Sequence, residues 1–243
     1  MKRRLIYGLL VCLFVCANGM VNNAFAAWKN INSPSDWASV AADDYVTIKI
    51  SGTVTLPSDI TCKQISFDQN YTILDLDGHN LNVTENLYMT NRDGLSIVNG
   101  NINVTGNFEM KSQNGSVTGN VTVGQDLYMT EKSGMCVTGN VIVGRDFQMK
   151  SQNGVVTGNV SVGGYMYMID QTGMKIDGNL IAGTGFQMKS QNGVVTGDVT
   201  VTKGNLEVID QTGMSINGSV SVSGNFTLKS QNASIGGSGE SIE

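Results

Sequence analysis

Two aspartates and the only histidine of the chain lie within five residues, in the stretch Asp75-Leu76-Asp77-Gly78-His79. If this stretch is an extended strand, alternation places both carboxylates on one face, about 6.5–7 Å apart. Glycoside hydrolases use pairs of carboxyl groups at such separations as acid and as base or nucleophile. The same residues also suit a solvated corner between two strands. We favour the corner and retain Asp75, Asp77 and His79 as catalytic candidates.

A second group of residues has the chemistry of ligand binding. Tyrosine, glutamine and lysine recur at regular intervals: Tyr88, Lys111, Tyr128, Gln148, Lys150, Tyr167, Gln187 and Lys189. Tyrosine offers an apolar ring and a hydroxyl, and its neighbours add hydrogen-bonding groups, so this array suits a long glycan or an extended peptide. The alternative is that these are ordinary residues of an exposed strand surface. We predict a carbohydrate or cell-surface ligand at these residues.

Methionines form a third regular set. Six of them occupy one position of a repeat: Met89, Met110, Met129, Met149, Met168 and Met188. Thioethers can bind soft metals, but Val208 and Leu228 take the same position in later repeats. Flexible packing in a core is therefore the favoured interpretation, and we expect neither a metal nor a cofactor.

These regular sets arise from an internal repeat of about 20 residues. Each unit opens on an apolar residue: Leu87, Phe108, Leu127, Phe147, Met166, Phe186, Leu206 and Phe226. Three short alternating strands follow in each unit, separated by turns rich in Gly and Asn. Such a pattern predicts one coil of a parallel β-solenoid per unit. Equivalent strands of successive coils then lie about 4.8 Å apart.

The exact copy is longer than one coil, because FQMKSQNGVVTG occurs at 147–158 and again at 186–197. At the opening position Phe alternates with Leu or Met. A large ring then meets a smaller side chain in the coil above and below, which fills a narrow core without overpacking. We infer that the duplicated unit is a pair of coils.

The sequence also predicts how the chain is divided. Residues 1–26 have a basic start, an apolar run and Ala24-Phe25-Ala26, as expected of a secretory signal peptide. Residues 27–45 are expected to form a cap, with a short helix over about 34–42 that brings Trp37 and Trp28 onto the open end of the core. About nine coils over 46–235 and a flexible tail over 236–243 complete the prediction. The C-terminal end has no comparable cap, so end-to-end self-association is expected there.

Charge and cysteines narrow the class further. Without residues 1–26, 12 basic residues face 20 acidic ones, which argues against a nucleic-acid partner. No later segment is apolar enough to span a membrane. Cys62 and Cys136 lie three coils apart, about 14 Å from the coil spacing, which exceeds the reach of a disulfide. We expect two free, mostly buried thiols.

Two segments, 44–53 and 73–79, resemble the opening coils of pectin-lyase-like right-handed parallel β-helix proteins. The later Gly-Asn-Val-x-Val-Gly units resemble the repeats of filamentous-haemagglutinin-type adhesins and autotransporter passengers. The first resemblance implies a right-handed coil and polysaccharide cleavage as an activity. The second implies adhesion.

Together these observations predict an all-β, single-stranded right-handed parallel β-helix. We expect it to be secreted, extracellular or at the cell surface, with the periplasm as another location, and to have a structural or adhesive role rather than a catalytic one. Two alternatives stay open. One is a polysaccharide lyase or glycoside hydrolase acting through Asp75 and Asp77, and the other is a self-assembling extracellular filament.

Overall fold

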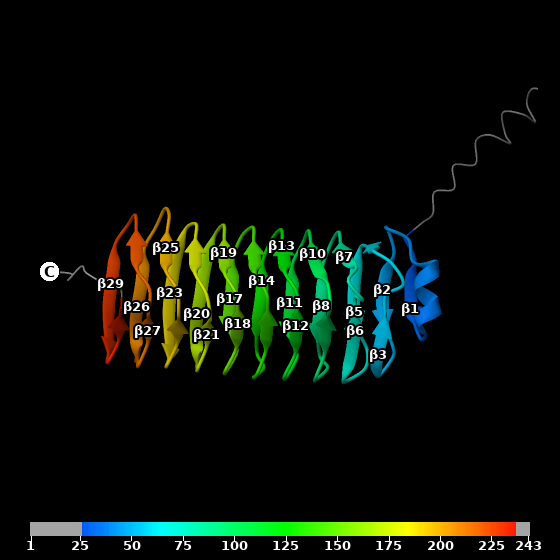
Figure 1. The fold of residues 1–243 in the computed structure, drawn as a ribbon, viewed down its shortest axis with the longest axis horizontal. Helices are drawn as coiled ribbons and strands as arrows, with labels where there is room; N and C mark the ends of the chain where they lie inside the picture. The colour runs from blue at the N-terminus through cyan, green and yellow to red at the C-terminus, as the bar shows by residue number, and fades with distance from the viewer. Residues whose placement is uncertain (1–25, 237–243) are drawn as a thin grey trace, which may run out of the picture.

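The chain forms a rod of stacked coils in the computed structural model, which describes residues 26–236 (Figure 1). The architecture is a right-handed parallel β-solenoid of about ten turns, built from three parallel sheets and almost no helix. The fold class expected from the sequence is therefore confirmed. The predicted signal peptide and C-terminal tail lie almost entirely outside the described residues, and the division of the chain remains a prediction.

Sheet A contains the strand that opens each coil. Its strands, in spatial order, are β1 (Trp28–Ile31), β2 (Tyr45–Ile48), β5 (Gln64–Phe67), β8 (Leu87–Thr90), β11 (Phe108–Lys111), β14 (Leu127–Thr130), β17 (Phe147–Lys150), β20 (Tyr165–Thr172), β23 (Gly185–Gln191), β26 (Leu206–Thr212) and β29 (Phe226–Gln231).

Sheet B follows after the first corner of each coil. It consists of β3 (Gly52–Thr55), β6 (Thr72–Asp75), β9 (Ser96–Val98), β12 (Ser116–Thr118), β15 (Cys136–Thr138), β18 (Val155–Thr157), β21 (Lys175–Ile176), β24 (Val194–Val195), β27 (Ser215–Ile216) and β30 (Ser234–Ile235).

Sheet C closes each coil. It consists of β4 (Ile60–Cys62), β7 (Asn80–Val83), β10 (Asn101–Val104), β13 (Val121–Val123), β16 (Val141–Val143), β19 (Val160–Val162), β22 (Leu180–Ala182), β25 (Val199–Val201) and β28 (Val220–Val222). Nine coils therefore have all three strands, and β1, β29 and β30 add partial coils at the two ends.

The core shows the predicted alternation of large and small side chains. Phe108 pairs in register with Leu87 and Leu127, and Phe147 pairs with Leu127 and Met166. All five side chains are fully buried. The six methionines of the repeat are fully buried as well, which supports their interpretation as core packing.

The structure adds a second reason why the repeat unit is a pair of coils. In the coils that begin with Phe108, Phe147 and Phe186, the sequence Ser-Gln-Asn-Gly leads from sheet A to sheet B, and its serine is buried, as Ser151 is. The other coils have a turn one residue longer, and this turn buries Leu or Met, as Met135 does. A coil with a large ring and a small serine thus alternates with a coil that has two mid-sized side chains.

The buried serines are not left without hydrogen bonds. The hydroxyl of Ser151 donates to the backbone carbonyl of Lys132 at 2.8 Å, and that of Ser190 donates to Gln171 at 2.9 Å. Each bond joins one coil type to the turn of the other type. The two turns are therefore complementary, and neither coil type alone would satisfy these buried polar groups.

An asparagine ladder holds the corner between sheets B and C. The side-chain oxygen of Asn120 accepts a hydrogen bond from the backbone N–H of Asn140 at 3.0 Å, and Asn140 in turn accepts from Asn159 at 3.0 Å. Asn159 accepts from Asn179 at 2.9 Å. This ladder explains why the Gly-Asn-Val sequence recurs from coil to coil.

The N-terminal end of the rod has the expected cap, with one difference. The helix is a 3-10 helix over Pro34–Ser39, shorter than predicted, and it places Trp37 on the core with 1% of its surface exposed. The backbone N–H groups of Asn32 and Ser33 donate to Asp36 Oδ2 at 2.8 Å and 2.9 Å, and these bonds, that of Asn32 most, lower the pKa of Asp36. The prediction for Trp28 is wrong, because β1 adds to sheet A and leaves Trp28 69% exposed, stacked on Tyr45 at 4.9 Å.

The two cysteines within residues 26–236, Cys62 and Cys136, are free, as expected. Cys62 is buried, but Cys136 is only half-buried because it points outward from β15, in register with Ser116 and Val155. Within residues 26–236 no helix has the length and apolarity needed to cross a membrane.

We predict that the two tryptophans differ sharply in their contribution to stability. Trp37→Ala should lower the free energy of unfolding by about 3–5 kcal/mol, because it opens a cavity over the first coil. Trp28→Ala should lower it by about 1 kcal/mol or less, because the ring is mostly exposed. Urea denaturation followed by circular dichroism measures both, and similar losses would contradict the assignment of Trp37 as the cap.

Thiol reactivity gives a second prediction. Burial, with the charge of Asp44 as a smaller cause, raises the pKa of the Cys62 thiol to about 12. At pH 8 iodoacetamide should modify Cys136 readily and Cys62 only after unfolding, since the thiolate is the nucleophile. The raised pKa also means that Cys62 contributes stability below pH 9 that is lost as the pH rises toward 12. Mass spectrometry measures the labelling of each cysteine. Equal labelling rates at Cys62 and Cys136 would disprove the predicted difference in reactivity.

Candidate functional site

The predicted ligand-binding residues lie on the outer face of sheet A, in two columns that run along the rod. The tyrosine column follows from the strand register and contains, in order, Tyr88, Glu109, Tyr128, Gln148, Tyr167, Gln187 and Glu207. The three tyrosines therefore occupy every second coil and are half-buried. From the strand spacing, neighbouring tyrosines lie about 9.6 Å apart.

The lysine column lies beside the tyrosine column, two residues further along the strand in the direction of sheet B. Lys111, Lys150 and Lys189 each form an ion pair with a carboxylate of the next coil. The nitrogen–oxygen distances are 3.0 Å for Lys111–Glu131, 3.5 Å for Lys150–Asp170 and 3.1 Å for Lys189–Asp210. Lys111 also lies 3.2 Å from Glu109, and the hydrogen bond to Glu131, more than any other cause, raises the pKa of Lys111.

Sequence reasoning missed the carboxylates of these pairs. Glu131, Asp170 and Asp210 have positive φ values of 71°, 70° and 68°. Glu131 follows the end of β14, and Asp170 and Asp210 lie where the register of β20 and β26 shifts, so regular strand alternation does not describe them. The sequence does contain a signal for them, because an acidic residue recurs at the same position in every second repeat unit.

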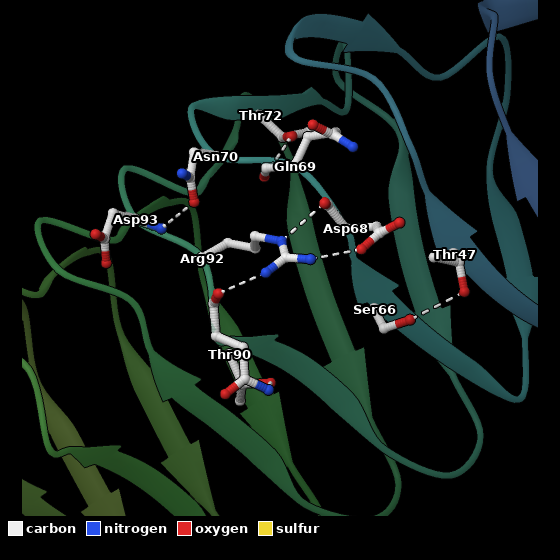
Figure 2. Close-up of polar contacts among 10 residues, drawn as sticks. Thr47, Ser66, Asp68, Gln69, Asn70, Thr72, Thr90, Arg92 and Asp93 are labelled. Atoms are coloured by element: carbon white, nitrogen blue, oxygen red, sulfur yellow. Dashed lines mark hydrogen bonds and ion pairs between the residues drawn. The ribbon is translucent and has the colours of Figure 1, made fainter.

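A related ion pair lies nearer the N-terminal end of the face. Figure 2 shows the guanidinium of Arg92 against Asp68, with 2.6 Å to the carboxylate and 2.7 Å from Nε to the backbone carbonyl. Here the cation reaches back to the preceding coil, whereas the lysines reach forward. Thr47 and Ser66, whose hydroxyls lie 3.2 Å apart, precede Tyr88 in the tyrosine column.

A shallow hollow of about 470 Å³ lies between the two columns and the turns. Its walls combine a ring, amides and paired charges. The lining residues are Lys111, Tyr128, Thr130, Glu131, Gln148, Lys150, Asp170 and Gln171. Four of the eight predicted binding residues thus meet in one place, namely Lys111, Tyr128, Gln148 and Lys150.

Two of the three tyrosine rings are held by neighbours in the same coil. The hydroxyl of Tyr128 donates to Asp126 Oδ2 at 3.1 Å, and the Tyr167 ring stacks on Tyr165 with centroids 5.6 Å apart. Burial is the main cause that raises the pKa of Tyr128 and of Tyr167, followed by the charges of Asp126 and Asp146 respectively. Both hydroxyls therefore stay protonated and can donate hydrogen bonds at neutral pH.

Tyr165 is a residue of this face that sequence reasoning missed. It is 43% exposed and pairs in register with Gly185 of the next coil. A Cβ atom at position 185 would come within 2.7 Å of the Tyr165 ring. Glycine at this position therefore lets the ring lie against β23.

The catalytic candidates lie at a corner, away from these columns. The expectation that both carboxylates share one strand face is wrong, because β6 ends at Asp75 and Asp77 follows in a turn with φ of 49°. Asp75 Oδ1 accepts hydrogen bonds from the backbone N–H of Asp77 and from the Asn99 amide, both at 3.0 Å. His79 Nδ1 lies 3.4 Å from Asp59 Oδ1. These contacts are typical of a turn between two strands, and the bond from Asn99 joins this turn to the next coil.

Comparisons with family models, with curated proteins and with solved structures give no match. The structure shows the parallel β-solenoid architecture, the resemblance to pectin-lyase-like proteins and to adhesins stays a prediction from the sequence, and any function must be argued from the surface of the rod.

Proposed function

We propose that this protein is an exported β-solenoid with an adhesive role, which binds an extended glycan along the outer face of sheet A. The observation that carries the proposal is the tyrosine column, in which half-buried rings recur at every second coil beside a hollow lined by amides and paired charges. Sugars bind to protein surfaces through such combinations of aromatic faces and hydrogen-bonding groups. The basic start, apolar run and Ala24-Phe25-Ala26 support export.

The rigidity of the face supports binding. The strands under it are fixed on both sides by neighbouring coils, and the rings are already held by Asp126 and Tyr165. Less side-chain freedom is lost on binding when the groups are ordered beforehand. A weak contact repeated along a rigid rod also gains from multivalency, because the second contact is intramolecular.

The alternative of polysaccharide cleavage through Asp75 and Asp77 has less support. Asp75 is engaged with Asp77 N–H and Asn99, and His79 is engaged with Asp59. A glycan on sheet A would also lie on a different face of the rod from this corner of sheet B.

We predict that a triple variant with Tyr88, Tyr128 and Tyr167 changed to Ala loses glycan binding by tenfold or more. The estimate assumes about 0.5–1.5 kcal/mol per aromatic contact, and about 1.4 kcal/mol corresponds to tenfold. The measurement is binding of the purified protein to a broad glycan array, followed by titration of the best ligand.

A matched control keeps the test specific. Thr122, Ser161 and Thr200 point outward from sheet C in register with its other strands, and their triple change to Ala should leave binding unchanged. If the tyrosine variant binds as tightly as the unchanged protein, the outer face of sheet A is not the binding site. Absence of binding by the unchanged protein would overturn the proposed function.

End-to-end assembly is a second candidate function, favoured by the last described coil. Leu228 is 44% exposed and Phe226 is only partly buried on β29, whereas their equivalents in earlier coils are buried. Unpaired strand edges with apolar side chains readily pair with another chain.

We predict concentration-dependent association that Leu228→Lys weakens, because the charge would have to be buried in the joint. Sedimentation velocity over a wide concentration range measures it. The control is Thr227→Lys, which places the same charge on the outer face of the same strand. Monomers alone at the highest concentration would exclude this candidate.

A further inference from the structure

We infer that the glycan bound on sheet A is linear and uncharged, and that it runs along the rod with two sugars for each pair of coils. This inference rests on the proposed function, and it specifies the class and the orientation of the ligand at the same face. Three features of the face carry it.

The first feature is that the charges of the face are engaged with each other. Lys111, Lys150 and Lys189 each lie within 3.5 Å of a carboxylate. Glu207 Oε2 accepts a hydrogen bond from the Gln187 amide at 2.7 Å. An anionic glycan would have to displace carboxylates from the lysines and would meet these carboxylates at close range, which is unfavourable. A neutral glycan meets hydroxyls, amides and ring faces without that cost.

The second feature is the period of the face. Along the rod the tyrosine column repeats every second coil, about 9.6 Å from the strand spacing. Across the rod no such repeat exists, since the outward residues change from Tyr128 to Thr130 to Glu131 within one coil. In an extended β-1,4-linked glycan successive rings point opposite ways, so the same ring face recurs at every second sugar. A disaccharide unit also advances by a length comparable with a pair of coils, so a chain parallel to the rod presents equivalent rings to Tyr128 and Tyr167.

The third feature is a widened aromatic platform at β20. Tyr165 stacks on Tyr167 with an interplanar angle of 22°, and Gly185 makes room for its ring. Two rings thus pack against each other here, whereas Tyr88 and Tyr128 have no such partner ring among the stacked aromatic pairs of the described residues. The strongest subsite of the face is therefore at β20.

The test uses the purified protein and oligosaccharides of two to eight sugars. The neutral set contains β-1,4-linked oligomers of glucose, mannose, xylose and N-acetylglucosamine, and the acidic set contains β-1,4-linked glucuronic acid oligomers. Titration calorimetry should show that affinity for the best neutral series increases stepwise with every second sugar. The acidic series should bind at least tenfold more weakly at equal length.

Single variants locate the platform. Tyr165→Ala should weaken binding of the longest neutral oligomer about tenfold. Tyr71→Ala should not change it, although Tyr71 is also exposed, at 68%, and also lies against a glycine of the next coil, Gly94. Circular dichroism confirms that both variants are folded.

The outcomes separate this inference from the proposed function. Tighter binding of the acidic series, affinity that does not depend on length, or an unaffected Tyr165→Ala variant would overturn the inference. The proposed function would survive any of these results if the triple tyrosine variant still lost binding. Absence of binding to both series and to the glycan array would overturn both.

Discussion

Backbone hydrogen bonding between each strand and its equivalent in the next coil is the constraint on which this structure depends. All the strand pairs are parallel and in register for most of their length. Each coil must therefore advance by the same distance, and equivalent residues stack directly on one another. Stacking favours residues that can bond to their own copies, as the asparagine ladder does. It also requires glycine where coils approach most closely: a Cβ atom at Gly158 would lie 2.3 Å from the carbonyl oxygen of Gly139, and φ there is 154°.

Core packing turns this one-coil period into a two-coil period. Identical large rings in every coil would overfill the narrow interior, and identical small residues would leave cavities. Two kinds of coil alternate and resolve this conflict. One kind buries a Phe and a Ser, and the other buries two mid-sized side chains, Leu or Met. The alternation extends to the turns, which differ in length, and from the turns to the surface. The position of the acidic residues and the interval between tyrosines are thus consequences of how the core is filled.

The ion pairs of the face balance its charge and contribute little to stability. The lysine side chains are 26–33% exposed and their partners are 63–65% exposed, and such pairs contribute about 0–1 kcal/mol each. Their effect is to neutralise the lysines while keeping polar atoms at the surface. A rigid face with rings, amides and internally compensated charges differs from the basic surfaces that bind polyanions.

The features that follow from periodicity could be predicted from the order of the amino acids alone. Strand alternation and a repeat of about 20 residues predicted the coils, the buried methionines, the stacking of Phe on Leu and the tyrosine column. These depend on which side of a strand a residue points to, which is a local property. The conformation of the corners and the contacts between coils became evident only from the three-dimensional fold. Asp77 adopts a turn with positive φ, β1 joins sheet A and leaves Trp28 outside, and Glu131 meets a lysine of the preceding coil. Such contacts depend on where the chain changes direction and on what lies 4.8 Å above or below, roughly one strand spacing away, and neither can be deduced from the alternation of residues along one strand.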